Sequence, residues 1–154
     1  ADLGGLLIDG YGDGICISND HENITFTESK DLSFGILQAS RMRVSKTEFI
    51  SCPGCGRTQF DLHETTLRIK QHFSHLSHLK IGVMGCVVNG PGEMSDVDYG
   101  FVGAGNGKIN LYRGQELVKR YIPYENAVEE LQQLIRENGD WTEPRNAVTE
   151  ATRT

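Results

Sequence analysis

The sequence has few cysteines, no long apolar run and no excess of positive charge. Only 4 of its 154 residues are cysteine, which is too few for the disulfide framework of a small secreted domain. No apolar stretch reaches the roughly 18 residues that indicate a transmembrane helix, and no secretory leader opens the chain. The net charge of −6 argues against a nucleic-acid-binding surface. These absences favour a protein of a reducing compartment.

The composition that remains is ordinary for a globular protein. Hydrophobic residues make up 38% and charged residues 23% of the chain, which supplies enough apolar surface for one core. The length predicts one domain, or one domain with a fragment of another.

Hydrophobic periodicity predicts alternating strands and helices in the second part of the chain. Helical spacing of apolar residues predicts amphipathic helices over 60–76 and 125–138, the second ending at Gly139. Strands are predicted at 49–50, 79–84, 99–102, 109–112 and 116–121. This order indicates an α/β fold with a mixed sheet and packed helices.

The first part of the chain carries weaker signals. We predict a short buried strand at Gly4–Ile8, a glycine-rich loop over 9–14 and a second strand at 15–17. A polar loop over 19–30 then precedes a helix at 32–39, which Gly35 weakens.

Two cysteines form the motif Cys52-Pro53-Gly54-Cys55. A C-x-x-C turn brings two sulfurs within reach of one metal centre. Thioredoxin-like redox chemistry, zinc binding and iron–sulfur ligation all use it. The alternative is two buried thiols without a role, although this spacing is a common ligand pattern.

A third cysteine, Cys86, follows the predicted strand 79–84 and enters the Gly- and Pro-rich loop 85–93. Ligands of α/β folds bind where strands end, and glycines let the backbone approach a bulky cofactor. Three thiolates on two loops predict an iron–sulfur cluster. One of its irons would lack a thiolate and could act as a Lewis acid on substrate oxygen as well as pass electrons.

Two polar residues of the same loop are candidates for the site. Glu93 lies seven residues after Cys86 and can fold back onto the cluster as a labile oxygen ligand. A surface glutamate is the alternative. Asn89 can donate to a bound anion or hydroxyl, or it can simply form the turn. Cys16 stands apart from both motifs, and we interpret it as a small buried hydrophobe.

Zinc is the competing metal, because His72, His75 and His78 follow the C-x-x-C motif. Their spacing departs from the roughly twelve residues and three to five residues of finger-type sites. Zinc would also leave Cys86 unexplained. We expect His72 and His75 to point to water, because Phe73 takes the apolar face of their helix.

The motifs SCPGCGR (Ser51–Arg57) and MGCVVNGPGE (Met84–Glu93) resemble the iron–sulfur domain of the 4-hydroxy-3-methylbut-2-enyl diphosphate synthases. This family belongs to the methylerythritol phosphate route to isoprenoids, and the second motif is highly specific. The GDG loop at 12–14 and the LQASRMR segment extend the resemblance from Ala1 to about Trp141. The segment DVDYGFVGAGNGKINLY resembles plant and chlamydial-type members.

The resemblance implies a 4Fe–4S cluster held by Cys52, Cys55, Cys86 and Glu93, with Asn89 near the substrate. Glu93 and Asn89 thereby acquire catalytic roles. The implied reaction is the reductive ring opening of 2-C-methyl-D-erythritol 2,4-cyclodiphosphate to 4-hydroxy-3-methylbut-2-enyl diphosphate, with loss of one hydroxyl as water. Ferredoxin or flavodoxin would supply the electrons.

The resemblance also implies a domain organisation. Residues 1–46 resemble the last β/α unit of an otherwise missing TIM barrel, and 47–140 a cluster domain similar to that of sulfite and nitrite reductases. Residues 141–154 are expected to form a disordered tail. Arg41 and Arg43 resemble positions near the substrate phosphates, which suits bidentate guanidinium chemistry, whereas surface solubility is the alternative.

We therefore expect the C-terminal part of a reductase, inactive as a fragment. Its location would be the bacterial cytoplasm, or the plastid stroma in a plant. The alternative is a self-contained electron-transfer or zinc-binding module without catalysis.

Overall fold

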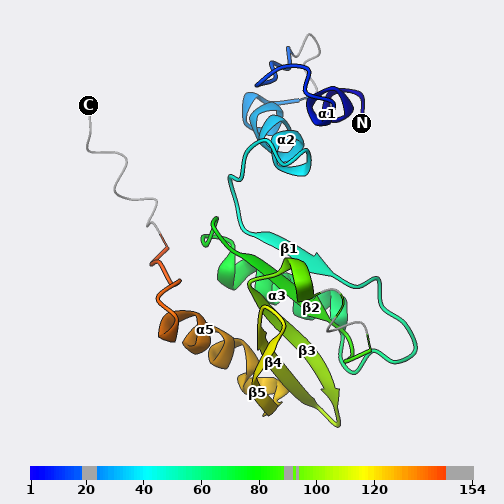
Figure 1. The fold of residues 1–154 in the computed structure, drawn as a ribbon, viewed down its shortest axis with the longest axis vertical. Coiled ribbons are helices and arrows are strands. Elements are labelled where there is room, and N and C mark those ends of the chain that lie inside the picture. The colour runs from blue at the N-terminus through cyan, green and yellow to red at the C-terminus, as the bar shows by residue number, and fades with distance from the viewer. Residues whose placement is uncertain (19–23, 89–91, 93, 145–154) are drawn as a thin grey trace. The chain divides into compact units, whose positions relative to one another are not determined.

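The computed structural model describes residues 1–18, 24–88, 92 and 94–144. The chain divides into two compact units, Ala1–Ser45 and Lys46–Thr154, and each unit is described by itself. The ribbon in Figure 1 shows two helices in the first unit and a sheet with helices in the second. None of the helices in the described ranges is both long and apolar enough to span a membrane.

The first unit contains α1 (Asp2–Ile8) and α2 (Phe26–Ala39). The strand predicted at Gly4–Ile8 is wrong, because this segment is helical and Asp9 N–H donates to the Gly5 carbonyl at 3.0 Å. A short apolar run fits a strand or a helix equally well. The strand predicted at 15–17 is also wrong, since these residues belong to neither helix nor strand.

Helix α2 begins at Phe26 rather than at the predicted residue 32, because a capping box starts it. The Thr25 hydroxyl accepts from Glu28 N–H at 3.2 Å, and the Glu28 carboxylate accepts from Thr25 N–H at 2.8 Å. These bonds satisfy two backbone donors that a helix start leaves open. The polar loop predicted over 19–30 is therefore wrong from Phe26 onward, while 19–23 lie outside the described residues.

The second unit is built on a five-stranded sheet in the order β1-β2-β3-β4-β5. Its first three strands are parallel, and β4 and β5 are antiparallel to their neighbours. The turn between β3 and β4 is Asn106-Gly107, both residues with positive φ, as in tight hairpins. The five predicted strands and the mixed sheet are confirmed. The strands are β1 (Glu48–Ser51), β2 (Lys80–Met84), β3 (Tyr99–Gly105), β4 (Lys108–Arg113) and β5 (Glu116–Pro123).

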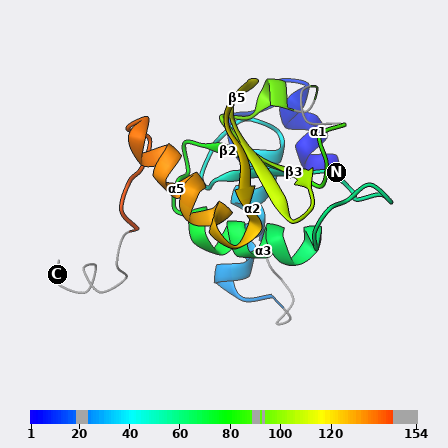
Figure 2. The same cartoon turned by 90° about the horizontal axis from the view of Figure 1, so that it is seen from below.

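Two helices, α3 (Leu62–Phe73) and α5 (Ala127–Glu137), cover one face of this sheet, as Figure 2 shows. Phe73 of α3 and Leu131 of α5 are fully buried with Phe101 of β3 in the main core. A smaller core on the other face includes Met94 of the short helix η1 (Met94–Asp96). Both predicted helices are confirmed, with shorter ends. A second short helix, η2 (Tyr124–Asn126), precedes α5.

The chain remains packed after α5. Gly139, with φ of 79°, follows the helix as predicted. The Tyr99 hydroxyl then donates to the Asp140 carboxylate at 2.6 Å, and the Trp141 ring contacts the Phe73 ring edge-to-face at 6.2 Å. The packed structure thus continues beyond residue 140, where a tail was expected to begin. Residues 145–154 lie outside the described residues.

Candidate metal centre

Cys52 and Cys86 emerge from neighbouring parallel strands at the same edge of the sheet. Strands β1 and β2 pair with Ser51 opposite Val83, and Cys52 N–H continues the pairing with a 3.4 Å bond to the Val83 carbonyl. Cys52 directly follows β1, and Cys86 lies two residues after the end of β2. The carboxyl ends of parallel strands are where α/β folds bind ligands.

The Cys52 thiol lies in a half-buried position between the two loops. Its sulfur accepts a hydrogen bond from Gly85 N–H at 3.3 Å, and its side chain packs against the smaller core. This hydrogen bond orients the Cys52 sulfur. It also links the first cysteine loop to the residue that precedes Cys86.

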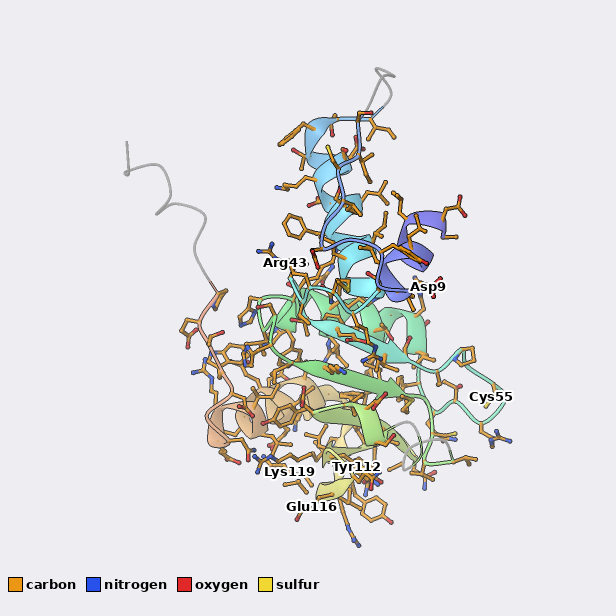
Figure 3. The ribbon with its side chains drawn as sticks, turned by 45° about the horizontal axis from the view of Figure 1, so that its top comes forward. Asp9, Arg43, Cys55, Tyr112, Glu116 and Lys119 are labelled. Atoms are coloured by element: carbon orange, nitrogen blue, oxygen red, sulfur yellow. The ribbon has the colours of Figure 1, made fainter. Side chains whose placement is uncertain are left out.

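Cys55 is exposed, on a loop that projects from the edge of the sheet (Figure 3). The pKa of its thiol is lowered, chiefly because the backbone N–H of Arg57 donates to the sulfur. The Arg57 guanidinium and hydrogen bonds with the side chains of Cys86 and Thr58 act in the same direction, against a partial loss of solvent. A lowered pKa favours the thiolate form that binds metals.

The donor chemistry of this edge fits an iron–sulfur cluster. Thiolates on two loops are the usual ligands of such clusters, and the hydrogen bond from Gly85 N–H to Cys52 links the two loops. Among the described residues no group of three or more His, Cys, Asp or Glu side chains already has an arrangement that holds a metal ion. Asn89 and Glu93 lie outside the described residues. The three thiols therefore supply donors for a cluster, and the fourth ligand is a matter for proposal.

The three histidines of the zinc interpretation are engaged elsewhere. The His72 ring lies 2.8 Å from the Gln132 side-chain amide, and the His78 ring lies 3.0 Å from the Asp140 carbonyl oxygen. His75 is half-buried, and its ring packs edge-to-face on Trp141 at 4.9 Å. The expectation that it points to water is wrong, because the segment after α5 covers it. The geometry does not favour zinc.

The remaining candidates belong to the first unit. Cys16 is exposed, so its interpretation as a buried hydrophobe is wrong. Arg41 and Arg43 are both exposed. The Arg43 guanidinium lies over the Phe34 ring, 5.3 Å from its centre. Arg41 adopts a left-handed backbone with φ of 60° at the end of α2, a conformation that costs a non-glycine residue roughly 1–2 kcal/mol. Strain of this kind often accompanies a functional side chain.

Sequence analysis missed two residues that join the cysteine loops, Thr58 and Gly85. Cys55 N–H donates to the Thr58 hydroxyl at 3.0 Å, and Gly85 N–H donates to Cys52 as described above. Thr58 could have been found from the sequence as a threonine three residues after Cys55, since Ser and Thr hydroxyls commonly close turns.

Comparisons with known proteins agree on one family. Residues 48–137 match the model of the GcpE protein C-terminal domain. A protein named 4-hydroxy-3-methylbut-2-en-1-yl diphosphate synthase (flavodoxin) from Parabacteroides distasonis is 61% identical over 141 residues, which cover 92% of this chain and 23% of that protein. Proteins of the same name from Porphyromonas gingivalis and Chlorobaculum tepidum are 55% and 56% identical over 143 and 141 residues. These matches cover 93% and 92% of this chain and 24% and 18% of those proteins.

The chain thus spans about a quarter or less of the length of these relatives. The matched residues include the five strands, α3 and α5, together with both cysteine loops. The chain belongs to the family of the GcpE protein C-terminal domain.

Proposed function

We propose that this chain is the cluster-carrying part of a 4-hydroxy-3-methylbut-2-en-1-yl diphosphate synthase, with a 4Fe–4S cluster held by Cys52, Cys55, Cys86 and Glu93. The observation that carries the proposal is the meeting of two cysteine loops at one edge of the sheet. The name shared by relatives of this identity supports the same reaction. The reductive ring opening of 2-C-methyl-D-erythritol 2,4-cyclodiphosphate consumes two electrons and releases one hydroxyl as water.

In this proposal, the cluster, Glu93 and Asn89 have different roles. When bound, the cluster supplies electrons one at a time and an iron that acts as a Lewis acid. Glu93 would hold the non-thiolate position, as a harder and more labile ligand than a thiolate. Asn89 orients the substrate by hydrogen bonding.

Two further parts of the proposal concern phosphate and electrons. Arg41 and Arg43 bind the diphosphate, since a guanidinium pairs with phosphate oxygens through two parallel hydrogen bonds. The strained backbone of Arg41 supports this role. The electron donor is a flavodoxin, the protein that the names of the relatives print, and a ferredoxin is the alternative donor.

Anaerobic reconstitution of the purified chain tests the cluster directly. We expect about four iron and four sulfide ions per chain, as a 4Fe–4S cluster requires, and broad visible absorbance that bleaches on reduction. Colourless protein with one equivalent of zinc would instead support a zinc module without catalysis. A colourless chain that retains neither metal would also contradict the proposal.

A further inference from the structure

The geometry points to Thr58 as a positioning residue that locks the Cys52–Cys55 loop onto Gly85 and so fixes the spacing of the three thiolates. This inference rests on the proposed cluster and concerns a residue outside the proposed ligand set. Thr58 is half-buried, between the C-x-x-C motif and α3.

Thr58 closes the turn that carries Cys55. The Thr58 hydroxyl accepts from Cys55 N–H at 3.0 Å, and Thr58 N–H donates to the Cys55 carbonyl at 3.0 Å. Two bonds between the same pair of residues fix both the start and the end of the turn. Because Cys55 is exposed, little side-chain packing holds its sulfur, and these bonds replace that packing.

The same side chain rests on the second cysteine loop. A Cβ added to Gly85 would lie 2.9 Å from both Cγ2 and Oγ1 of Thr58, closer than such atoms approach. Gly85 is buried and immediately precedes Cys86. Only a glycine therefore allows Thr58 to lie this close to the backbone that delivers the third thiol.

Further hydrogen bonds hold Gly85 from both sides. Its N–H donates to the Cys52 sulfur at 3.3 Å, and its carbonyl accepts from Gln59 N–H at 3.0 Å. On the sheet side, a Cβ added to Gly103 of β3 would overlap the Gly85 carbonyl oxygen. The Gly85 peptide is thus held between the Thr58–Gln59 segment and β3.

A site with three thiolates needs this fixation more than one with four. Without a fourth thiolate, retention of the cluster depends on the other three keeping their mutual distances. Residues that orient metal ligands typically change metal affinity or activity by about 10- to 100-fold when they are replaced. Thr58 acts on Cys55 through hydrogen bonds and on Cys86 through contact with Gly85, so one side chain influences two ligands.

Isosteric and conservative variants separate the hydroxyl from simple packing. Thr58→Val keeps the volume but removes the acceptor for Cys55 N–H, and Thr58→Ser keeps the hydroxyl. On the reconstituted chain we expect Thr58→Val to lose iron to a chelator about tenfold faster than wild type, with an altered EPR spectrum of the reduced cluster. Thr58→Ser should restore the wild-type spectrum and most of the retention.

A matched control distinguishes this effect from general destabilisation. Thr47→Val removes a buried hydrogen bond to the Phe73 carbonyl of 2.7 Å, at the end of β1 away from Cys52. It should lower the urea midpoint of unfolding, because a buried hydrogen bond is lost, and leave the rate of iron loss unchanged.

Gly85→Ala tests the contact between Thr58 and Gly85 from the loop that carries Cys86. The added methyl group must displace Thr58, so we expect the same rapid iron loss and altered spectrum as in Thr58→Val. Wild-type retention and spectra in both Thr58→Val and Gly85→Ala would overturn the inference. Failure of the wild-type chain itself to take up a cluster would instead overturn the proposed function.

Discussion

The four cysteines of the chain differ in what surrounds them. Cys52, Cys55 and Cys86 lie on the two loops that follow β1 and β2, whereas Cys16 is exposed in the other compact unit. We therefore expect Cys→Ser at each of the three clustered positions to abolish stable cluster binding, since a serine hydroxyl is a poor substitute for a thiolate on iron.

Cys16→Ser is the matched control, and it should retain the wild-type iron and sulfide content. The measurement is iron, sulfide and visible absorbance after anaerobic reconstitution of all four variants. Loss of the cluster in Cys16→Ser would mean that the site uses four cysteines and has no open iron.

The Cys→Ser variants remove a ligand, whereas the informative substitution at Glu93 is one that replaces a weak ligand by a stronger one. In the full-length enzyme, Glu93→Cys should give a cluster at least as stable as that of wild type, but poor turnover. The reason is that a thiolate does not yield to a substrate oxygen as a carboxylate does. Glu93→Ala should give a more oxygen-sensitive cluster with weak activity, because water would take the position.

Mössbauer or EPR spectra beside steady-state rates test both Glu93 variants. If Glu93 is an ordinary loop residue, neither change will affect the cluster. Wild-type spectra and rates in the two variants together would refute its assignment as a ligand.

At the scale of elements, the segment after α5 is held by one aromatic side chain and its neighbours. The Trp141 ring lies under the Arg136 guanidinium at 4.5 Å and packs on His75. Its indole N–H donates to the Glu143 carboxylate at 2.9 Å, and Arg136 pairs with the same carboxylate at 3.0 Å. Tyr99 and Asp140 form a further hydrogen bond beside it, which helps to raise the pKa of the tyrosine, although burial contributes most.

Acid should weaken the contact of Glu143 with Trp141 and Arg136, because Glu143 takes part in it as a carboxylate. The hydrogen bond from Trp141, followed by the interaction with Arg136, holds the Glu143 pKa below its ordinary value of 4.5. A carboxyl with a lowered pKa stabilises the folded state above that ordinary value, and the contribution is lost as the pH falls through the folded pKa. Glu143→Gln should therefore reduce the pH dependence of the contact below about pH 4.5.

Tryptophan fluorescence reports this change locally, since the sequence contains a single Trp. Urea titrations at neutral and acidic pH, with Glu137→Gln at the end of α5 as a control, separate the Glu143 carboxylate from the general effect of acid. An unchanged pH dependence in Glu143→Gln would show that Glu143 does not hold the segment.

The sequence predicted the second unit well because its signals agree with one another. Asn106-Gly107 marks a tight turn, and the strands on both sides carry the buried residues Phe101 and Leu111. Residues 4–8 offered only a short apolar run, which became α1. The start of α2 was missed, although its capping box has the pattern Thr-x-x-Glu from Thr25 to Glu28, because this pattern lies in a polar segment.

The candidate site was predictable in its cysteines but not in the residues that support their loops. Cys52, Cys55 and Cys86 stand in recognisable motifs, because ligand chemistry restricts residue type. The roles of Thr58 and Gly85 depend on how two loops approach each other in space, and no local spacing encodes that approach.

At the scale of the whole molecule, the first unit has little core of its own. Among its described residues only Leu7 is a buried hydrophobic side chain, while Ile8, Tyr11 and Phe26 are 69%, 70% and 85% exposed. A unit that buries so little apolar surface gains little stability from folding alone. Arg41 and Arg43 belong to this unit, so the groups proposed for phosphate binding lie on a unit that buries little apolar surface among its described residues.

The second unit is well packed, whereas the first unit buries little apolar surface, and this difference bears on catalysis by the chain. The chain spans only about a quarter of relatives that carry the enzyme's name, and much of an enzyme's rate enhancement comes from holding the substrate in a reactive geometry. The reconstituted chain should therefore accept electrons from a strong reductant but form no product from 2-C-methyl-D-erythritol 2,4-cyclodiphosphate. The full-length Parabacteroides distasonis relative, assayed beside it with the same reductant, is the positive control. Bleaching of the cluster without product in the chain, and with product in the relative, is the expected pair of results. Product formation by the chain at a rate comparable to that of the relative would show that the cluster domain and the first unit together suffice for catalysis.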